Sequence, residues 1–117
     1  MQHAPVKPTV SIDDVGRLDV RVGTVLFVED IPGSRKLMKL TVDFGDHQRT
    51  IVAGIKKERA NPREIEGFQA LFVVNLQPQE LAGVTSEGMV FDIGYSDGIV
   101  PVLATPEKRV PNGARAG

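Results

Sequence analysis

The sequence predicts a small all-β protein that folds as a five-stranded barrel with one short helix. Several segments alternate between apolar and polar residues or run apolar over strand lengths, and glycine and proline separate them. With 117 residues, of which 41% are apolar, the chain can build one hydrophobic core but not two. We therefore expect a mobile leader over residues 1–10 and a single domain over residues 11–117.

The domain is expected to begin with one helical turn. Ser11 is the predicted N-cap, Asp14 stands three residues later as in a capping box, and Gly16 ends the turn. A small apolar stripe lies along this turn and consists of Ile12, Val15 and Leu18. The stripe must pack either on the body of the domain or on a second subunit, and the sequence leaves both open.

Three strands are predicted next. Apolar residues alternate at period two over residues 18–28 and again over residues 38–44, which is the pattern of half-buried strands. Gly23 in the first segment predicts a bend or bulge, which would let one long strand serve two sheets of a small barrel. A tight turn at Gly45 and Asp46 makes residues 48–55 the hairpin partner of the second strand.

A short helix and two further strands complete the pattern. Asn61 as N-cap, Pro62 at the first helical position and Gly67 as the stop predict a helix between the third and fourth strands. Residues 68–76 are predicted as a strand buried on both faces and residues 88–95 as a last strand, with residues 98–103 as a short edge strand. This order is that of an OB-fold, a partly open barrel with a ligand-binding face. Another small barrel or a sandwich with a similar number of strands is the alternative.

Charge is unevenly distributed along the chain. Residues 33–63 contain eight basic and three acidic residues, whereas residues 64–97 contain six acidic residues and no lysine or arginine. Such an asymmetry indicates either one side of the fold that faces a polyanion or simply solvated surfaces. The total formal charge of −1 favours neither.

The residue types exclude most kinds of chemistry. Cysteine is absent, which excludes disulfides, thiol nucleophiles and cysteine-based metal sites. His3 lies in the leader and His47 in a predicted hairpin turn, so neither a catalytic triad nor a histidine metal cluster is expected, and no glycine-rich phosphate loop is present. No apolar run approaches the roughly 18 residues of a membrane span. We expect a soluble, cytoplasmic protein without enzymatic activity, metal or cofactor.

Several short motifs follow one another in order along residues 12–113. They are DVRVG at 19–23, SRKL at 34–37, VDFG at 42–45, RTIVAGI at 49–55, NL at 75–76, SEGM at 86–89 and the tail over 105–113. Together they resemble the motifs of the tRNA-binding domain family. This module is found at the C-terminus of many methionyl-tRNA synthetases and in stand-alone bacterial tRNA-binding proteins.

The resemblance implies an OB-fold that binds the outer corner of tRNA through shape and backbone, largely independently of sequence and without an active site. It also implies a homodimer built through the N-terminal turn and the C-terminal extension, and an aminoacyl-tRNA synthetase as a possible partner in trans. Five candidate nucleic-acid-binding residues match family positions: Lys36, Arg49, Asn75, Ser86 and Met89. Charge and strand alternation add four more: Arg35, Lys39, Lys56 and Lys57.

Three of these candidates also have a purely structural interpretation. Arg49 could pair with Asp43 or Asp46, Asn75 could hold its turn through backbone hydrogen bonds, and Met89 could fill the core.

The chain departs from the family where cations are expected after the NL motif. The residues that stand there are Gln77, Gln79, Glu80 and Ala82. Each missing phosphate contact weakens RNA binding and lowers its salt dependence, so binding would depend on residues 35–39 and 56–59. A second hypothesis is a dimeric chaperone of the related CsaA type, which would hold unfolded export precursors or peptides. The segments 49–55 and 86–89 resemble the tRNA-binding branch more.

Overall fold

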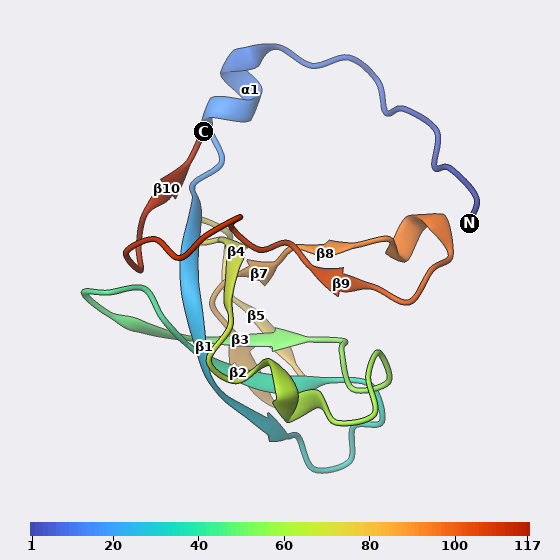
Figure 1. Ribbon diagram of the computed structural model, residues 1–117, viewed down its shortest axis with the longest axis vertical. Coiled ribbons are helices and arrows are strands. Elements are labelled where there is room, and N and C mark those ends of the chain that lie inside the picture. Colours follow the sequence, from blue (N-terminus) through green and yellow to red (C-terminus); the bar gives the residue numbers. More distant parts are fainter.

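The computed structural model describes residues 1–117 and consists almost entirely of β-strands. Its longest strand, β1 (Val20–Asp30), lies at the centre of a curled sheet in the order β3, β2, β1, β4 and β7 (Figure 1). The other four strands are antiparallel to their neighbours: β2 (Met38–Asp43), β3 (Gln48–Ala53), β4 (Gln69–Val73) and β7 (Met89–Val90). This sheet is an all-β, OB-like half-barrel, which confirms the predicted fold class.

Eight short elements surround the sheet. Two separate hairpins are formed by β5 with β6 and by β8 with β9, whereas β10 pairs with the beginning of β1. The elements are α1 (Ile12–Gly16), η1 (Pro62–Ile65), β5 (Gln79–Leu81), β6 (Val84–Ser86), β8 (Asp92–Ile93), η2 (Tyr95–Asp97), β9 (Val102–Leu103) and β10 (Arg115–Ala116).

Strand β1 serves two parts of the barrel, as its length predicts. Its first half pairs with β4 and its second half with β2, and the register shifts between Val25 and Phe27. The predicted irregularity therefore exists, but it does not lie at Gly23. Gly23 is needed for packing instead, because a Cβ there would lie 2.6 Å from Cγ1 of Val42 and 2.9 Å from Cε1 of Phe44.

The hydrophobic core fills the inner side of the curled sheet. Strand β2 shows the alternation most clearly, with Met38, Leu40 and Val42 buried and the residues between them half-buried. Ile51 of β3 and Phe72 of β4 are fully buried opposite them. Burial of each such side chain contributes about 1.5–3 kcal/mol, so this inner layer carries much of the stability.

Residues 86–88 close the barrel between β3 and β7. The Ser86 hydroxyl accepts a hydrogen bond from the Val52 backbone N–H at 2.9 Å. The Glu87 backbone N–H donates to the Thr50 carbonyl at 2.8 Å, and its carboxylate accepts from the Thr50 N–H at 3.0 Å. This segment thus provides hydrogen-bond partners for the backbone groups at the edge of β3. It then leads directly into β7 beside β4.

Both predicted helical segments exist, but they are short. Ser11 and Asp14 form both hydrogen bonds of the capping box around α1, as predicted. The second segment is a single 3-10 turn whose N-cap, Asn61, accepts from the Arg63 backbone N–H at 3.1 Å.

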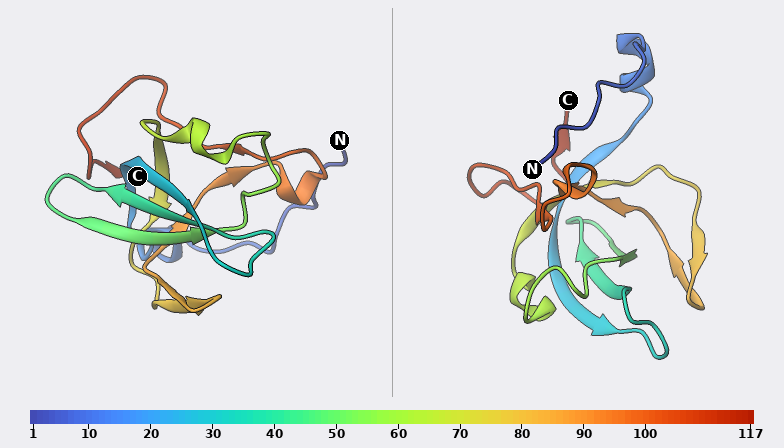
Figure 2. Two further views of the ribbon diagram at one scale, coloured as in Figure 1. Left: turned by 90° about the horizontal axis from the view of Figure 1, so that it is seen from below. Right: turned by 90° about the vertical axis from the view of Figure 1, so that its right-hand side faces the viewer.

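The strand predictions are wrong in detail beyond residue 73. Strand β4 ends at Val73 rather than at residue 76, and the predicted strand over 88–95 is divided into β7 and β8. The polar stretch after Asn75 forms the β5–β6 hairpin, which stands out from the barrel (Figure 2). The hairpin turns at Ala82 and Gly83, both with positive φ, a conformation that the sequence does not signal at an alanine.

The N-terminal leader arches away from the barrel and meets it at the η2 turn (Figure 1). The backbone N–H groups of Gln2 and Ala4 donate to Asp97 at 3.0 and 2.7 Å, so the leader reaches the η2 turn. Helix α1 stands away from the barrel beside the C-terminus (Figure 1), and none of its residues is buried. The apolar stripe of α1 therefore does not pack on the body of the domain. No helix has the length and apolar character needed to cross a membrane.

Candidate nucleic-acid interface

The outer face of strands β1, β2 and β3 is a surface of the sheet that the core does not use. Strand register places Lys39 between Glu29 of β1 and Val52 of β3, and Thr41 between Phe27 and Thr50. We call this surface, made of Phe27, Glu29, Lys39, Thr41, Thr50 and Val52, the outer sheet face. The loop over residues 31–37 lies at one end of it and the β5–β6 hairpin beside β3.

The loop over residues 31–37 brings two predicted cations to this end of the sheet. Arg35 and Lys36 are exposed, and the Lys36 ammonium lies 5.9 Å from the centre of the Tyr95 ring. The Lys36 side chain also passes over Gly54, where a Cβ would lie 3.1 Å from its Cε. Lys36 is therefore held over the end of β3 while its charge stays accessible.

A second basic loop follows β3 and adjoins the first. The Lys56 backbone N–H donates to the Lys36 carbonyl at 3.1 Å, which joins the two loops. The Lys56 ammonium pairs with Asp30 at 2.9 Å, whereas Lys57 is exposed and forms no ion pair. The structure thus brings five of the predicted residues together: Arg35, Lys36, Lys39, Lys56 and Lys57.

Arg49 is separated from this group. It shares the inward face of β3 with Ile51, at the opposite end of the hairpin from Lys39. Its guanidinium donates to the carbonyls of Val74 at 2.6 Å and Glu87 at 3.1 Å, and to His47 at 2.9 Å. Arg49 ties barrel segments together and does not form the pair with Asp43 or Asp46 that the sequence suggests.

Asn75 and Ser86 are also engaged within the protein. The Asn75 side chain accepts from the Asp19 N–H at 2.8 Å and donates to the Arg17 carbonyl at 2.7 Å, so it joins the end of β4 to the start of β1. The Ser86 side chain is buried, and its hydroxyl donates to the Gly88 carbonyl at 3.1 Å. The structural interpretation of Asn75 agrees with this geometry, although its partners lie in a distant part of the chain.

Met89 lines a hollow between β3 and the β5–β6 hairpin. The side chain is 43% exposed and is not core filler. The hollow measures about 540 Å³ and is half apolar, with Val52, Leu76, Gln77, Gln79, Leu81, Ser86 and Gly88 as its other lining residues. The hairpin residues at the usually basic positions contribute amides and one carboxylate but no positive charge.

Two arginines, one in β1 and one in β10, share one aspartate. Arg21 and Arg115 contact the Asp19 carboxylate at 2.8 and 3.2 Å. The Arg21 guanidinium, through its hydrogen bond, holds the pKa of Asp19 below its usual range. These cations fasten β10 to the start of β1.

A buried carboxyl lies next to the basic loops. Burial, together with the neighbouring Asp92 carboxyl group, raises the pKa of Glu58 to about 7. Arg59 lies 3.6 Å from the Glu58 carboxylate and opposes this rise. Since Asp92 belongs to β8, this contact joins the loop after β3 to the C-terminal extension.

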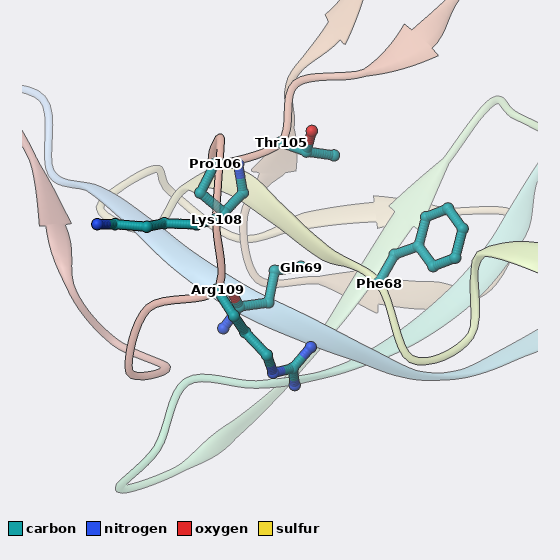
Figure 3. Close-up of a pocket in the computed structure, with 6 residues that line it drawn as sticks. All are labelled: Phe68, Gln69, Thr105, Pro106, Lys108 and Arg109. Carbon is teal, nitrogen blue, oxygen red and sulfur yellow. The ribbon is translucent and has the colours of Figure 1, made fainter.

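A basic hollow that the sequence does not predict lies beside the start of β4. It is lined by Phe68, Gln69, Thr105, Pro106, Lys108 and Arg109 (Figure 3). The Arg109 guanidinium reaches back to Thr24 and Gly67, at 3.3 and 3.4 Å, whereas the Lys108 amine points away from it (Figure 3). Only the two adjacent cations after Pro106 signal this feature in the sequence.

The fold and the outer sheet face define the class of protein. An OB-like barrel with an open strand face between two flanking loops is an architecture used to bind oligonucleotides. The chain belongs to the tRNA-binding domain family, since residues 20–115 match the family described as a putative tRNA binding domain.

Relatives with known names agree with this membership. The chain is 41% identical over 110 residues to the methionine–tRNA ligase of Parabacteroides distasonis and 44% identical over 109 residues to that of Archaeoglobus fulgidus. These matches cover 94% and 93% of the chain but only 16% of each relative, so the chain spans a small part of their length.

The solved structures of similar fold include a protein related to methionyl-tRNA synthetase (MetRS) and a chaperone. A MetRS-related protein from Pyrococcus horikoshii has a TM-score of 0.86 and 39% identity, and the match covers 95% of this chain and all of that one. The chaperone CsaA from Bacillus anthracis has a TM-score of 0.80 and 33% identity, with 94% and 100% covered.

Proposed function

We propose that the chain binds tRNA by structure, largely independently of sequence, and catalyses no reaction. The observation that carries this proposal is the group of five cations beside the outer sheet face, in a chain of the tRNA-binding domain family. Phosphate neutralisation supplies much of the affinity for nucleic acid, and folded RNA is recognised mainly through its shape, phosphates and 2′-hydroxyls.

The candidate residues divide into two roles in this proposal. Arg35, Lys36, Lys39 and Lys57 contact phosphates, and Lys56 joins them through its loop while it also pairs with Asp30. Met89 contacts the RNA from the hollow beside the hairpin. Arg49, Asn75 and Ser86 hold the barrel segments that position these groups, because their polar atoms already have partners within the chain.

Tight binding is not expected from this set of contacts. The β5–β6 hairpin has no cation, so the number of phosphate contacts is small. Each contact contributes about −0.9 to the slope of log affinity against log salt for a duplex. We therefore expect moderate affinity and a salt slope that corresponds to only a few phosphate contacts.

Titration with unfractionated tRNA at two salt concentrations tests the proposal. Lys36→Ala should weaken binding several-fold and reduce the salt slope by about one. Lys108→Ala is the matched control, since Lys108 lies in the hollow of Figure 3 and should leave binding unchanged. Absence of tRNA binding by the parent protein at low salt would overturn the proposal.

We extend the proposal to a homodimer. The α1 stripe is exposed, with 81% of Ile12, 54% of Val15 and 49% of Leu18 accessible. The β8–β9 hairpin and η2 expose further large apolar side chains, namely Ile93, Tyr95, Ile99, Val100 and Val102. Apolar surface of this extent favours coverage by another subunit. Because the named relatives are methionine–tRNA ligases, we further propose that the dimer assists such a synthetase in trans, in the cytoplasm.

A peptide-binding chaperone is the second candidate. It is favoured by the similarity to CsaA structures and by the half-apolar hollow at Met89. Titration with an unfolded export-type polypeptide in parallel with tRNA separates the two. A protein that binds the polypeptide but does not bind tRNA would favour the chaperone.

A further inference from the structure

Phe27 is the aromatic residue of the outer sheet face. Its side chain is 54% exposed, although it lies within the longest strand of the sheet. The sequence does not single it out, because it stands in an apolar run with Val25, Leu26 and Val28. Only the structure distinguishes the buried members of this run from the exposed one.

The register shift in β1 turns Phe27 outward. In a regular strand, residues 25 and 27 point to the same face. Here Val25 and Val28 are both buried, and the shift between Val25 and Phe27 reverses the alternation. Bulges are frequent beside functional sites, where they redirect a side chain. Phe27 is thus presented to solvent by the backbone itself.

The surroundings of Phe27 are suited to a neutral, hydrogen-bonding ring. Thr41 and Thr50 lie in the same row across β2 and β3, and their hydroxyls share its face. The next row, about 7 Å along the strands, holds Lys39 between Glu29 and Val52. Glu29 and Lys39 balance each other in charge, whereas Arg35 and Lys36 lie beyond them at the end of the sheet.

We propose that Phe27 stacks on an unpaired base of the bound RNA, with Thr41 and Thr50 beside the base edge and the cations of the basic loops on the backbone. Bases that leave the RNA stack are commonly bound on aromatic side chains. The row of Phe27, Thr41 and Thr50 itself carries no charge, which suits a base better than a phosphate. The inference rests on the proposed RNA-binding function and adds that the ligand presents at least one base out of the helix.

Tryptophan fluorescence gives a direct test. The chain contains no tryptophan, so Phe27→Trp creates a single reporter on the outer sheet face. Stacking of a base on the indole should quench its emission on addition of tRNA. Phe68→Trp is the matched control, because Phe68 is 51% exposed but lies in the hollow of Figure 3. We expect strong quenching at position 27 and little at position 68.

Affinity and salt dependence give an independent readout. Phe27→Ala should weaken tRNA binding about 10-fold without changing the salt slope, since stacking releases no counterions. Lys39→Ala should lower the slope by about one. Phe27→Leu, which keeps the apolar volume but not the ring, should behave as Phe27→Ala does. Full affinity of Phe27→Leu would overturn stacking.

A single-stranded RNA oligomer separates this inference from the proposed function. If the oligomer quenches Phe27→Trp and the protein does not bind tRNA, the tRNA function is refuted and stacking of a base on residue 27 is supported. If tRNA binds without any quenching at position 27, stacking on residue 27 is refuted, whereas the proposed tRNA-binding function is not. An emission change of Phe27→Trp with protein concentration alone would mean that another protein chain covers this face, which also overturns the inference.

Discussion

Ser86 stands at the point where the barrel closes, and its hydroxyl serves two backbone groups there. Oγ accepts from the Val52 N–H at 2.9 Å and donates to the Gly88 carbonyl at 3.1 Å. A buried N–H without a partner costs about 1–3 kcal/mol. We therefore expect Ser86→Ala to lower the free energy of unfolding by about this amount in urea denaturation.

Thr85→Ala is the control for this residue. Thr85 is the exposed neighbour of Ser86, and its hydroxyl contacts only the Glu80 side chain. Its replacement should change stability by less than about 0.5 kcal/mol. Unchanged stability of Ser86→Ala together with weaker tRNA binding would instead place Ser86 at the RNA surface.

At the level of elements, the β5–β6 hairpin turns through an alanine in a left-handed conformation. Ala82 has φ of 51° and is followed by Gly83 at 80°. A side chain with Cβ is disfavoured there by about 1–2 kcal/mol, and Asn tolerates the conformation better, especially before Gly. Ala82→Asn should raise the melting temperature or the protection of hairpin amides by an amount equivalent to about 0.5–1 kcal/mol. Lower protection would mean that the turn has another conformation.

The contact between the loop after β3 and β8 should make stability depend on pH. Glu58 Oε1 and Asp92 Oδ1 are buried without a hydrogen-bond partner, and a proton on Glu58 lets the two carboxyl groups hydrogen-bond. The folded pKa of Glu58, about 7, lies above the ordinary value of 4.5. The folded protein therefore binds the proton more tightly, and stability falls as pH rises from about 4.5 to 7.

Removal of this charge should abolish that dependence. Glu58→Gln should match the parent near pH 4.5 and exceed it at pH 8 by up to about 3 kcal/mol, because one pKa unit corresponds to about 1.4 kcal/mol. Denaturation at both pH values measures the difference. Glu64→Gln, which removes an exposed partner of Arg59, is the control and should change little at either pH. Equal gains at both pH values would contradict the role of the Glu58 proton.

At the scale of the whole molecule, the exposed stripe of α1 predicts association. Val15→Asp places a charge in that stripe and should convert the proposed dimer to a monomer in sedimentation velocity. Val6→Asp makes the same change at a leader residue that is 99% exposed and should leave the dimer intact. A parent protein that is monomeric at micromolar concentration would contradict the homodimer.

The sequence by itself was sufficient for the fold class, the antiparallel order of the first three strands, the capping box at Ser11 and family membership. These properties depend on local periodicity and on short ordered motifs, which are carried by neighbouring residues. The alternation over residues 38–44, for example, matches the burial of β2.

Tertiary structure decided which side chains remain available to a ligand. Arg49 is drawn inward to carbonyls of Val74 and Glu87, Ser86 is buried at the barrel closure, and Phe27 is turned outward by a register shift. Each outcome depends on contacts between strands far apart in the chain, and a one-residue shift in register reverses which face a side chain occupies. For that reason the sequence could predict a barrel with a basic side, while only the folded sheet placed the five cations and Phe27 around one face.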